Sequence, residues 1–379
     1  MNLDPQNLTF LFEGPSQDVL ARHFLEDSRT ASLSWQYRFY YRIRSLIPIR
    51  IRQFLQQRRS KRIDPNRDWF LPADFIAELI KALKDDIRVN GDRDMLDPWP
   101  TGYQMAASLT HDVETRNGVL LVDKIAKIEE SLGFRSCWNF VPHKYKIEPE
   151  LIEDLKNRGH EVGVHGYNHD GKLFLSRSIF DARSAAIQQA IDRFSANGFR
   201  SPMVHRNLEW ISELDIHYDA SCFDIDPFQA MPGGVGSIWP FVKGDLVELP
   251  YTMPQDHTLF VALKEKGIGS WKKKFEFLRK WRAMSLVITH PDYLDSVDRQ
   301  ANYREYLQFL SQQKDCWHAL PKDIADWWKR RHDTLLVDGK AVGSAANEAN
   351  VIKLSLFVSD HSGAKESSVD TSQKIGVPQ

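Results

Sequence analysis

The chain contains 379 residues, and its 50 Lys and Arg against 51 Asp and Glu give a formal net charge of −1. Its 11 Trp, 11 Tyr and 21 Phe exclude a wholly disordered chain, and its 20 Gly and 18 Pro exclude a collagen-like or other low-complexity protein. No run of about 18 apolar residues occurs in the sequence, so we expect no membrane-spanning helix.

The first 100 residues are predicted to be an N-terminal extension that contains a strongly basic arm. Residues 28–63 include no acidic residue and ten basic ones: Arg29, Arg38, Arg42, Arg44, Arg50, Arg52, Arg58, Arg59, Lys61 and Arg62. The other residues carry 40 basic against 51 acidic side chains, so an arm of charge +10 is joined to a body of charge −11.

Aromatic and aliphatic residues alternate with Arg along this arm, which leaves two interpretations open. Such an arm can lie on the inner surface of an anionic membrane, where Arg pairs with phosphate while the apolar side chains insert. It can also dock on the acidic body of the same chain, where Arg42, Arg44, Arg50 and Arg52 pair with acidic residues and the apolar residues cover part of the core. We expect no nucleic acid as a partner.

The later segments of the chain predict an alternation of strands and helices. Apolar spacing over residues 69–83 predicts a packing helix, and the Asp, Gly and Pro content of residues 90–100 predicts a linker. Seven short apolar segments are then predicted strands: residues 105–110, 136–141, 161–165, 199–203, 218–223, 246–250 and 285–290. Amphipathic helices are predicted over residues 121–132, 178–194, 271–284, 298–314 and 321–331.

This alternation predicts a parallel sheet, and seven strands favour its closure into a barrel over residues 101–335. The small, polar residues at 336–379 predict a disordered tail, interrupted by a strand-like run at 351–358.

The cysteines and the start of the chain predict the compartment. Cys137, Cys222 and Cys316 are odd in number and far apart, which favours buried free thiols and a reducing compartment. The first 21 residues contain no basic residue and no long apolar run, so they do not resemble a secretory signal. We therefore expect a cytoplasmic protein, peripheral to the inner membrane surface if the arm binds lipid.

Two histidines at the end of one predicted strand are the strongest local signal for chemistry. His165 closes the strand EVGVH, and His169 follows four residues later in a segment with Gly166, Asn168 and Gly171 that is typical of a loop. Neutral imidazole is a common zinc ligand, so the pair can hold a metal ion if both rings face one point. By itself, such a pair is more often structural than metal-binding.

Two acidic residues follow the first predicted strand. Asp112 and Glu114 lie two residues apart, so in an extended segment both side chains face the same way. One could complete a three-ligand metal site and the other could act as a general base. Alternatively, Glu114 belongs to the first turn of the next helix and is solvated.

Two further residues lie at or near the ends of predicted strands. His290 ends the strand LVITH, and Arg200 lies in the segment GFRSP. Each has a simpler interpretation alone, as a hydrogen-bonded core histidine and as the partner of a surface acid. Because barrel enzymes place their chemistry at the carboxyl ends of the strands, their coincidence with the other motifs predicts one site.

The order of these motifs resembles that of the polysaccharide deacetylase family, the NodB-homology domains of carbohydrate esterase family 4. The resemblance covers residues 103–293 and implies an α/β fold, a distorted (β/α)7 barrel, to which this chain adds an N-terminal helical extension. The family's motifs fall on Thr110-His111-Asp112-Val113-Glu114, on His165 and His169, on Arg200-Ser201-Pro202, and on Leu286 and His290.

The resemblance also implies an activity, N-deacetylation of an N-acetylated sugar or polysaccharide precursor with a divalent metal ion, for which zinc is expected. It implies three metal ligands: Glu114, His165 and His169. It implies three catalytic residues: Asp112 as the base, His290 as the general acid and Arg200, which orients Asp112.

The sequence departs from the family pattern at several positions. Glu114 stands where Asp is usual, and His111 has no usual counterpart, so a shifted register with Asp112 as the ligand stays open. Met203 and Val204 replace the customary Tyr-Gly pair. The family's Asp/Trp motif has only loose candidates: Asp224, Asp226 and Trp239.

Two other functions are compatible with the same sequence. One is a metal-dependent amidase acting on an amide that is not a sugar. The other is a catalytically inactive glycan-binding barrel that has lost its metal through the altered first motif.

Overall fold

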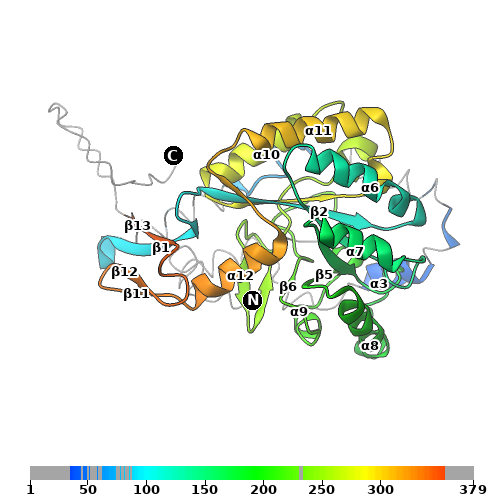
Figure 1. Cartoon of the computed structure of the whole chain (residues 1–379), viewed down its shortest axis with the longest axis horizontal. Coiled ribbons are helices and arrows are strands. Elements are labelled where there is room, and N and C mark those ends of the chain that lie inside the picture. The colour runs from blue at the N-terminus through cyan, green and yellow to red at the C-terminus, as the bar shows by residue number, and fades with distance from the viewer. Residues whose placement is uncertain are drawn as a thin grey trace.

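The computed structural model describes residues 35–43, 46–48, 51, 58, 62–73, 77, 81, 85, 88–229 and 234–354. Figure 1 shows a large barrel region surrounded by helices and, at one end, a small layer of strands. Among the described helices, none combines the length and apolar character needed to cross a bilayer.

Seven parallel strands form the barrel, as the sequence predicts. They are β2 (Met105–Val113), β3 (Cys137–Phe140), β4 (Glu161–His165), β5 (Gly198–Arg200), β6 (Tyr218–Asp219), β8 (Leu246–Glu248) and β9 (Met284–Thr289). Each pairs in parallel with the next from β2 to β8, and β9 pairs with the other end of this series at β2. The distorted (β/α)7 barrel is therefore confirmed.

The ring closes through irregular chain rather than a full strand pair. After β8, the backbone N–H groups of Thr252 and Met253 donate to the Leu286 carbonyl of β9, at 3.3 and 3.2 Å. On the opposite side of β8, the two-residue strand β6 is followed by a single bridge between Phe223 and Tyr251. Because these short contacts close the ring in place of a full strand pair, the barrel is irregular. The closing segment, residues 249–256, runs to the carboxyl end of β9.

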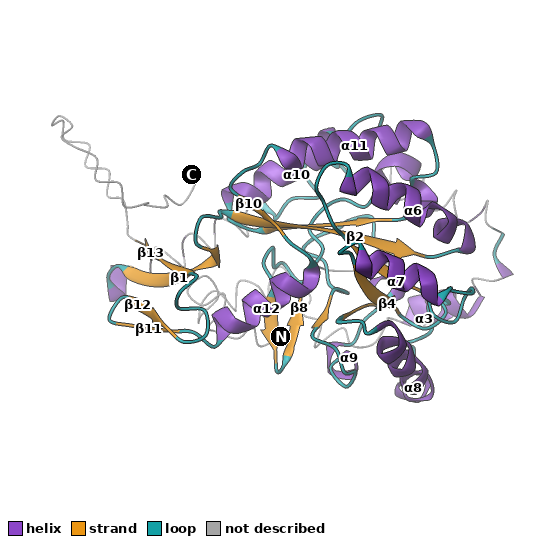
Figure 2. Cartoon of the chain, in the orientation of Figure 1, coloured by secondary structure: helices purple, strands orange, loops and turns teal. Residues whose placement is uncertain are grey.

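Helices cover the outside of the strands (Figure 2). They are α6 (Arg116–Glu130), α7 (Pro149–Asn157), α8 (Arg177–Phe194), α9 (Leu208–Ile211), α10 (Gly269–Lys280), α11 (Val297–Ser311) and α12 (Pro321–His332). Three tighter or wider turns lie among them: η2 (Pro202–Val204), η3 (His257–Ala262) and η4 (Pro291–Tyr293). Side-chain caps fix several helix starts; Ser176, for example, accepts a hydrogen bond from the Ile179 N–H and begins α8 one residue before the predicted position.

Additional strands extend or flank the barrel. β7 (Phe241–Lys243) pairs antiparallel with β8, and β10 (Cys316–His318) pairs in parallel with the start of β2. β1 (Arg93–Pro100) pairs antiparallel with β13 (Ala349–Leu354), and β11 (Leu335–Val337) pairs with β12 (Lys340–Val342). The sequence did not predict β1, β7, β10, β11 or β12, and it placed β13 only approximately.

The predicted linker and part of the predicted tail are wrong. Residues 90–100 contain β1, whose Trp99 is fully buried and donates from Nε1 to the Arg282 carbonyl at 2.7 Å. The boundary at 336 also fails, because residues 336–354 contain strands and β13 supplies the partner of β1. The remainder of the tail, 355–379, lies outside the described residues, as does most of the helix expected at 69–83.

The described part of the basic arm contacts the barrel. Helix α3 (Trp35–Ile43) buries Tyr41 to 6% exposure, with its ring edge-on to the ring of His205 at 4.5 Å between centroids. This aromatic contact agrees with the apolar part of the docking interpretation. Arg42 is exposed, and Arg44, Arg50 and Arg52 lie outside the described residues. Most other arm residues lie outside the described residues.

Candidate active site

The ends of β2 and β4 bring the three expected metal ligands together. Ligand atoms of Glu114, His165 and His169 all lie within 4.8 Å of one another. His165 is the last residue of β4, and the following loop returns His169 to the same point, where its Nε2 lies 2.8 Å from Glu114 Oε1. This answers the geometric question that the sequence leaves open, since the turn does bring both imidazoles to one side.

These residues fit a divalent metal ion. The Nε2 atoms of His165 and His169 are both buried; that of His165 has no hydrogen-bond partner among the described residues, and that of His169 faces Glu114. His165 Nδ1 donates to the Arg200 carbonyl at 3.0 Å, which leaves the lone pair of Nε2 directed at the site. Burial lowers the pKa of His165 to about 4, so its imidazole is neutral at pH 7, the form that binds metals. Two nitrogens and one carboxylate match a common ligand set of catalytic zinc.

Asp112 lies beside this cluster inside the barrel. Its Oδ1 accepts hydrogen bonds from Arg200 Nη1 and from Asn139 Nδ2, both at 3.0 Å, while its Oδ2 lies 3.8 Å from His165 Nε2. Burial disfavours the charge of Asp112, but His165 and Arg200, with smaller contributions from His290 and Asn139, together outweigh burial and hold the pKa of Asp112 below its usual value. The carboxylate is therefore ionised and one of its oxygens stays available.

His290 approaches the cluster from the end of β9. Its Nδ1 lies 2.8 Å from Asp256 Oδ1, and its backbone N–H donates to Asp256 Oδ2 at 2.7 Å. Its Nε2 lies 3.6 Å from Glu114 Oε1. Burial opposes the charge of His290, but the carboxylate of Asp256 outweighs it and raises the pKa of His290 to about 10. The imidazole can therefore donate a proton at neutral pH.

Asp256 is the residue that sequence reasoning missed. It is fully buried and directly precedes η3, and the ring-closing segment after β8 carries it to His290. The other site residues were predicted because they lie at or just after the end of a strand. No strand ends at Asp256, so this criterion does not identify it.

The loose candidates for the Asp/Trp motif lie elsewhere and make structural contacts. Asp224 forms a buried ion pair with Lys274 at 2.6 Å. Asp226 accepts from Trp69 Nε1 at 3.2 Å and from the Tyr251 hydroxyl at 2.9 Å. Trp239 Nε1 donates to the carbonyl of Arg282 at 3.0 Å.

His111 faces away from the site. Its Nε2 lies 2.7 Å from Glu129 Oε1, its Nδ1 lies 2.7 Å from Thr289 Oγ1, and its ring stacks on Trp138 at 3.9 Å between centroids. Alternation along β2 explains this, because adjacent side chains point to opposite faces of a strand. The first motif therefore keeps a register in which Asp112 faces the barrel interior and Glu114 is the carboxylate grouped with the two histidines.

The departure from the family pattern at Met203 and Val204 has a backbone consequence. Met203 has φ 59° and Val204 has φ 51°, so both adopt a left-handed conformation within η2. Glycine, customary in the family at the second position, adopts this conformation without strain, whereas a β-branched residue rarely does. Strained backbone of this kind is often found beside functional sites.

Several solved structures are similar to this chain. A candidate polysaccharide deacetylase from Mycobacterium smegmatis has a TM-score of 0.51 and 20% sequence identity, over 61% of this chain and 92% of the other. A candidate polysaccharide deacetylase from Pseudomonas aeruginosa PAO1 has a TM-score of 0.49 and 16% identity, over 64% and 96%. The Puue allantoinase has a TM-score of 0.49 and 16% identity, over 63% and 94%.

No family model matches the chain, and no curated protein matches it. At 20% identity the likeness to the Mycobacterium smegmatis structure shows the fold alone. The chain is therefore a barrel with the polysaccharide deacetylase fold.

Proposed function

We propose that this protein is a metal-dependent hydrolase of a carbon–nitrogen amide bond, an N-deacetylase acting on an N-acetylated sugar or polysaccharide precursor. The observation that carries the proposal is the convergence of Glu114, His165 and His169 within 4.8 Å. An ionised Asp112 and a protonated His290 approach this cluster from two different strands. The fold shared with a candidate polysaccharide deacetylase supports an acetamido sugar as the substrate class.

The proposed reaction needs a deprotonated base and a protonated acid at the same pH. When bound to the three ligands, a divalent ion, for which we propose zinc, supplies a Lewis acid to the acetamide carbonyl and makes water more acidic. Asp112 accepts the proton of the attacking water, since its carboxylate is ionised and Arg200 holds it in place. The products are acetate and a free amine.

His290 completes the reaction by protonating the departing nitrogen. An amine leaves poorly as an anion, so a positioned donor is needed when the carbon–nitrogen bond breaks. Asp256 holds the imidazole through Nδ1, which leaves the Nε2–H free to face the reacting bond. Environments that separate the pKa values of two neighbouring groups are typical of acid–base pairs in enzymes.

The test combines metal content with acetate release. Purified protein should contain one equivalent of a divalent metal and release acetate from N-acetylhexosamine oligosaccharides, and Asp112→Asn should abolish release while metal content stays unchanged. Activity that survives both Asp112→Asn and His165→Ala would exclude the mechanism. Bound metal without acetate release from any glycan would favour the amidase alternative, and a folded protein without metal would favour the inactive glycan-binding barrel.

We also propose that the enzyme works in the cytoplasm and contacts the anionic inner membrane surface through residues 28–63. The three free cysteines support a reducing compartment. Helix α3, fixed to the barrel by Tyr41, leaves the large apolar side chains of Trp35 and Phe39 74% and 60% exposed. Exposed aromatics within a segment of charge +10 have the chemistry of a lipid-binding surface.

Vesicle co-sedimentation tests this contact. The protein should bind vesicles that contain phosphatidylserine, lose binding at high salt, and lose it in a Trp35→Ser/Phe39→Ser variant. Leu120→Ser provides the control, because Leu120 is 74% exposed on α6, outside the arm. Equal binding by all three proteins would contradict the proposal.

A further inference from the structure

The loop that carries His169 adopts a backbone conformation that is energetically unfavourable. His169 has φ 61°, and Gly166 and Gly171 have φ 62° and 75°. A left-handed conformation costs a non-glycine residue roughly 1–2 kcal/mol. Inside the loop, the described side-chain bonds are short-range: the Asp170 N–H donates to Asn168 Oδ1 at 3.2 Å and the Lys172 N–H to Asp170 Oδ1 at 2.9 Å. A restraint from outside the loop is therefore needed to keep His169 in one place.

Arg183 of α8 supplies such a restraint. Its Nη1 and Nη2 donate to Asp170 Oδ1 and Oδ2 at 2.9 and 2.8 Å, and the centre of its guanidinium lies 4.9 Å from the centroid of the Tyr167 ring. The side chains of Arg183 and Asp170 are only 19% and 28% exposed. A two-bond contact between a guanidinium and a carboxylate fixes both distance and orientation, unlike a single point contact.

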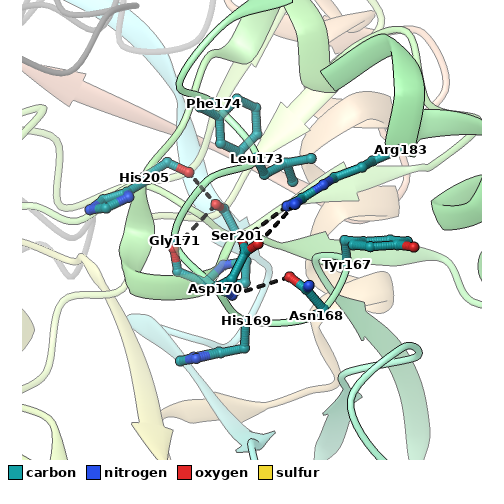
Figure 3. A pocket seen from close by; sticks show the side chains of 11 residues that line it. Tyr167, Asn168, His169, Asp170, Gly171, Leu173, Phe174, Arg183, Ser201 and His205 are labelled. Atoms are coloured by element: carbon teal, nitrogen blue, oxygen red, sulfur yellow. Dashed lines mark hydrogen bonds and ion pairs between the residues drawn. The ribbon is translucent and has the colours of Figure 1, made fainter. Parts of the chain in front are cut away.

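The two residues that Arg183 contacts lie on both sides of His169 in the sequence. Figure 3 shows Arg183 and Tyr167 on one side of the loop, with His169 projecting away from them. Tyr167 is itself anchored, because its ring stacks on His143 at 4.5 Å and its carbonyl accepts from the His143 N–H at 3.1 Å. Because Tyr167 and Asp170 are both held by Arg183, the backbone between them can adopt few conformations. This restricts the position of the His169 imidazole.

We propose that Arg183 is a positioning residue that sets the metal affinity of the site by fixing the loop that presents His169. The proposal rests on the proposed function, in which His169 is a metal ligand. Arg183 is not one of the three proposed ligands, which are Glu114, His165 and His169. Its action passes through Asp170 and Tyr167 to the backbone of His169.

The test measures zinc affinity of the metal-free full-length protein by competition with a chromophoric chelator. Arg183→Leu should bind zinc about 10- to 100-fold more weakly, the range typical for the loss of a group that orients a ligand. Arg183→Lys keeps the positive charge but loses the two-bond contact with Asp170, so its zinc affinity should lie between those of Arg183→Leu and the wild type. The absorption spectrum of the cobalt-loaded Arg183→Leu protein should also change, since the geometry of the His169 ligand changes.

Arg177→Leu is the matched control. Arg177 belongs to the same helix and makes the same kind of fork, with Nη1 and Nη2 both 2.6 Å from the carboxylate of Glu213. Its loss should leave zinc affinity and the cobalt spectrum unchanged. If Arg183→Leu does not fold, Arg183→Lys carries the test.

Two outcomes separate this inference from the proposed function. Zinc affinities of the folded Arg183 variants within twofold of the wild type would overturn the inference while leaving the metal site intact. A wild-type protein that binds no zinc, cobalt or manganese would overturn the proposed function, and this inference with it.

Discussion

Asp256 decides the protonation of His290 although no catalytic motif contains it. Its carboxylate contacts both the ring Nδ1 and the backbone N–H of His290, at 2.8 and 2.7 Å. Asp256→Asn should therefore lower kcat by about 10²- to 10⁴-fold, the range usual for a general acid, without loss of metal. Acetate-release kinetics together with metal analysis check this. Asp292→Asn is the control, because Asp292 lies two residues from His290 and accepts instead from the Thr115 hydroxyl; an equal loss in both variants would contradict a specific role for Asp256.

Glu161 at the start of β4 makes the stability of the fold depend on pH. Burial raises the pKa of Glu161 to about 7, although the Tyr218 hydroxyl and the Lys322 N–H donate to it at 2.8 and 3.1 Å. The folded state therefore holds a proton that the unfolded state, with a pKa near 4.5, releases. Its contribution to stability is complete below about pH 4.5 and is lost as pH rises to about 7, in total roughly 3 kcal/mol.

Glu161→Gln should remove this dependence, because the amide keeps an acceptor for Tyr218 but does not titrate. The measurement is the free energy of unfolding in urea at pH 5 and pH 7.5 for both proteins. The wild type should lose more stability than the variant over this interval. Equal losses in the two proteins would show that Glu161 is not protonated in the fold.

The chemically active residues could be predicted from sequence where each follows a strand. Asp112, His165 and His290 all come at the carboxyl end of a recognisable apolar segment, and parallel strands collect such ends at one edge. Asp256 could not be predicted in this way, since its pairing with His290 depends on irregular chain that closes the barrel. Asp224 is an acidic residue and therefore a candidate for the Asp/Trp motif. Only the fold shows that it is already paired with Lys274.

At the scale of elements, Gly171 connects the histidine loop to helix α3. It has φ 75°, and a Cβ at this position would lie 2.7 Å from the Tyr41 ring and 2.9 Å from Met203 Sδ. Gly171→Ala should therefore displace Tyr41 and weaken the docking of α3. The backbone of α3 should then unfold more often, and trypsin should cleave after Arg42 faster. The measurement is the rate of tryptic cleavage after Arg42.

Gly133→Ala separates this contact from backbone strain. Gly133 has φ 83°, but a Cβ there would meet nothing within 4 Å. Both variants should lose about 1 kcal/mol or more of stability because alanine is disfavoured at positive φ. Only Gly171→Ala should accelerate cleavage in the arm, and equal cleavage rates in the two variants would contradict the docking of α3 through Tyr41.

The missed strand β1 shows why composition misleads at this scale. Residues 90–100 contain the Asp, Gly and Pro typical of a linker, yet Leu96 and Trp99 are buried. The partner of β1 is β13, more than 240 residues later in the chain, so no local pattern could supply it. Arg331 holds the strand from the other side by donating to the carbonyls of Leu96 and Asp97 at 2.7 and 2.9 Å.

At the scale of the whole molecule, the alternation of strands and helices was sufficient to predict the barrel. Each of the seven predicted strands is present, because strands buried on both faces produce apolar runs that are visible without an alignment. How the ring closes could not be predicted, since β6 has only two residues and closure relies on the segment after β8. The position of α3 against the barrel could not be predicted either, because the described contacts of Tyr41 are with His205 and with the loop at Gly171, which are far from it in the sequence.

The metal site should link distant parts of this barrel and thereby stabilise the whole fold. Glu114 follows β2, while His165 and His169 belong to the end of β4 and its loop, so an ion bound to all three binds the folded state but not the unfolded one. At a free metal concentration 100 times the dissociation constant, folding gains about 2.7 kcal/mol. Removal of the ion by a chelator should lower the unfolding midpoint by several degrees, and added zinc should restore it. His165→Ala should abolish the difference between the two conditions, because the remaining two ligands bind zinc too weakly; an unfolding midpoint that responds to chelator equally in wild type and variant would place the ion elsewhere.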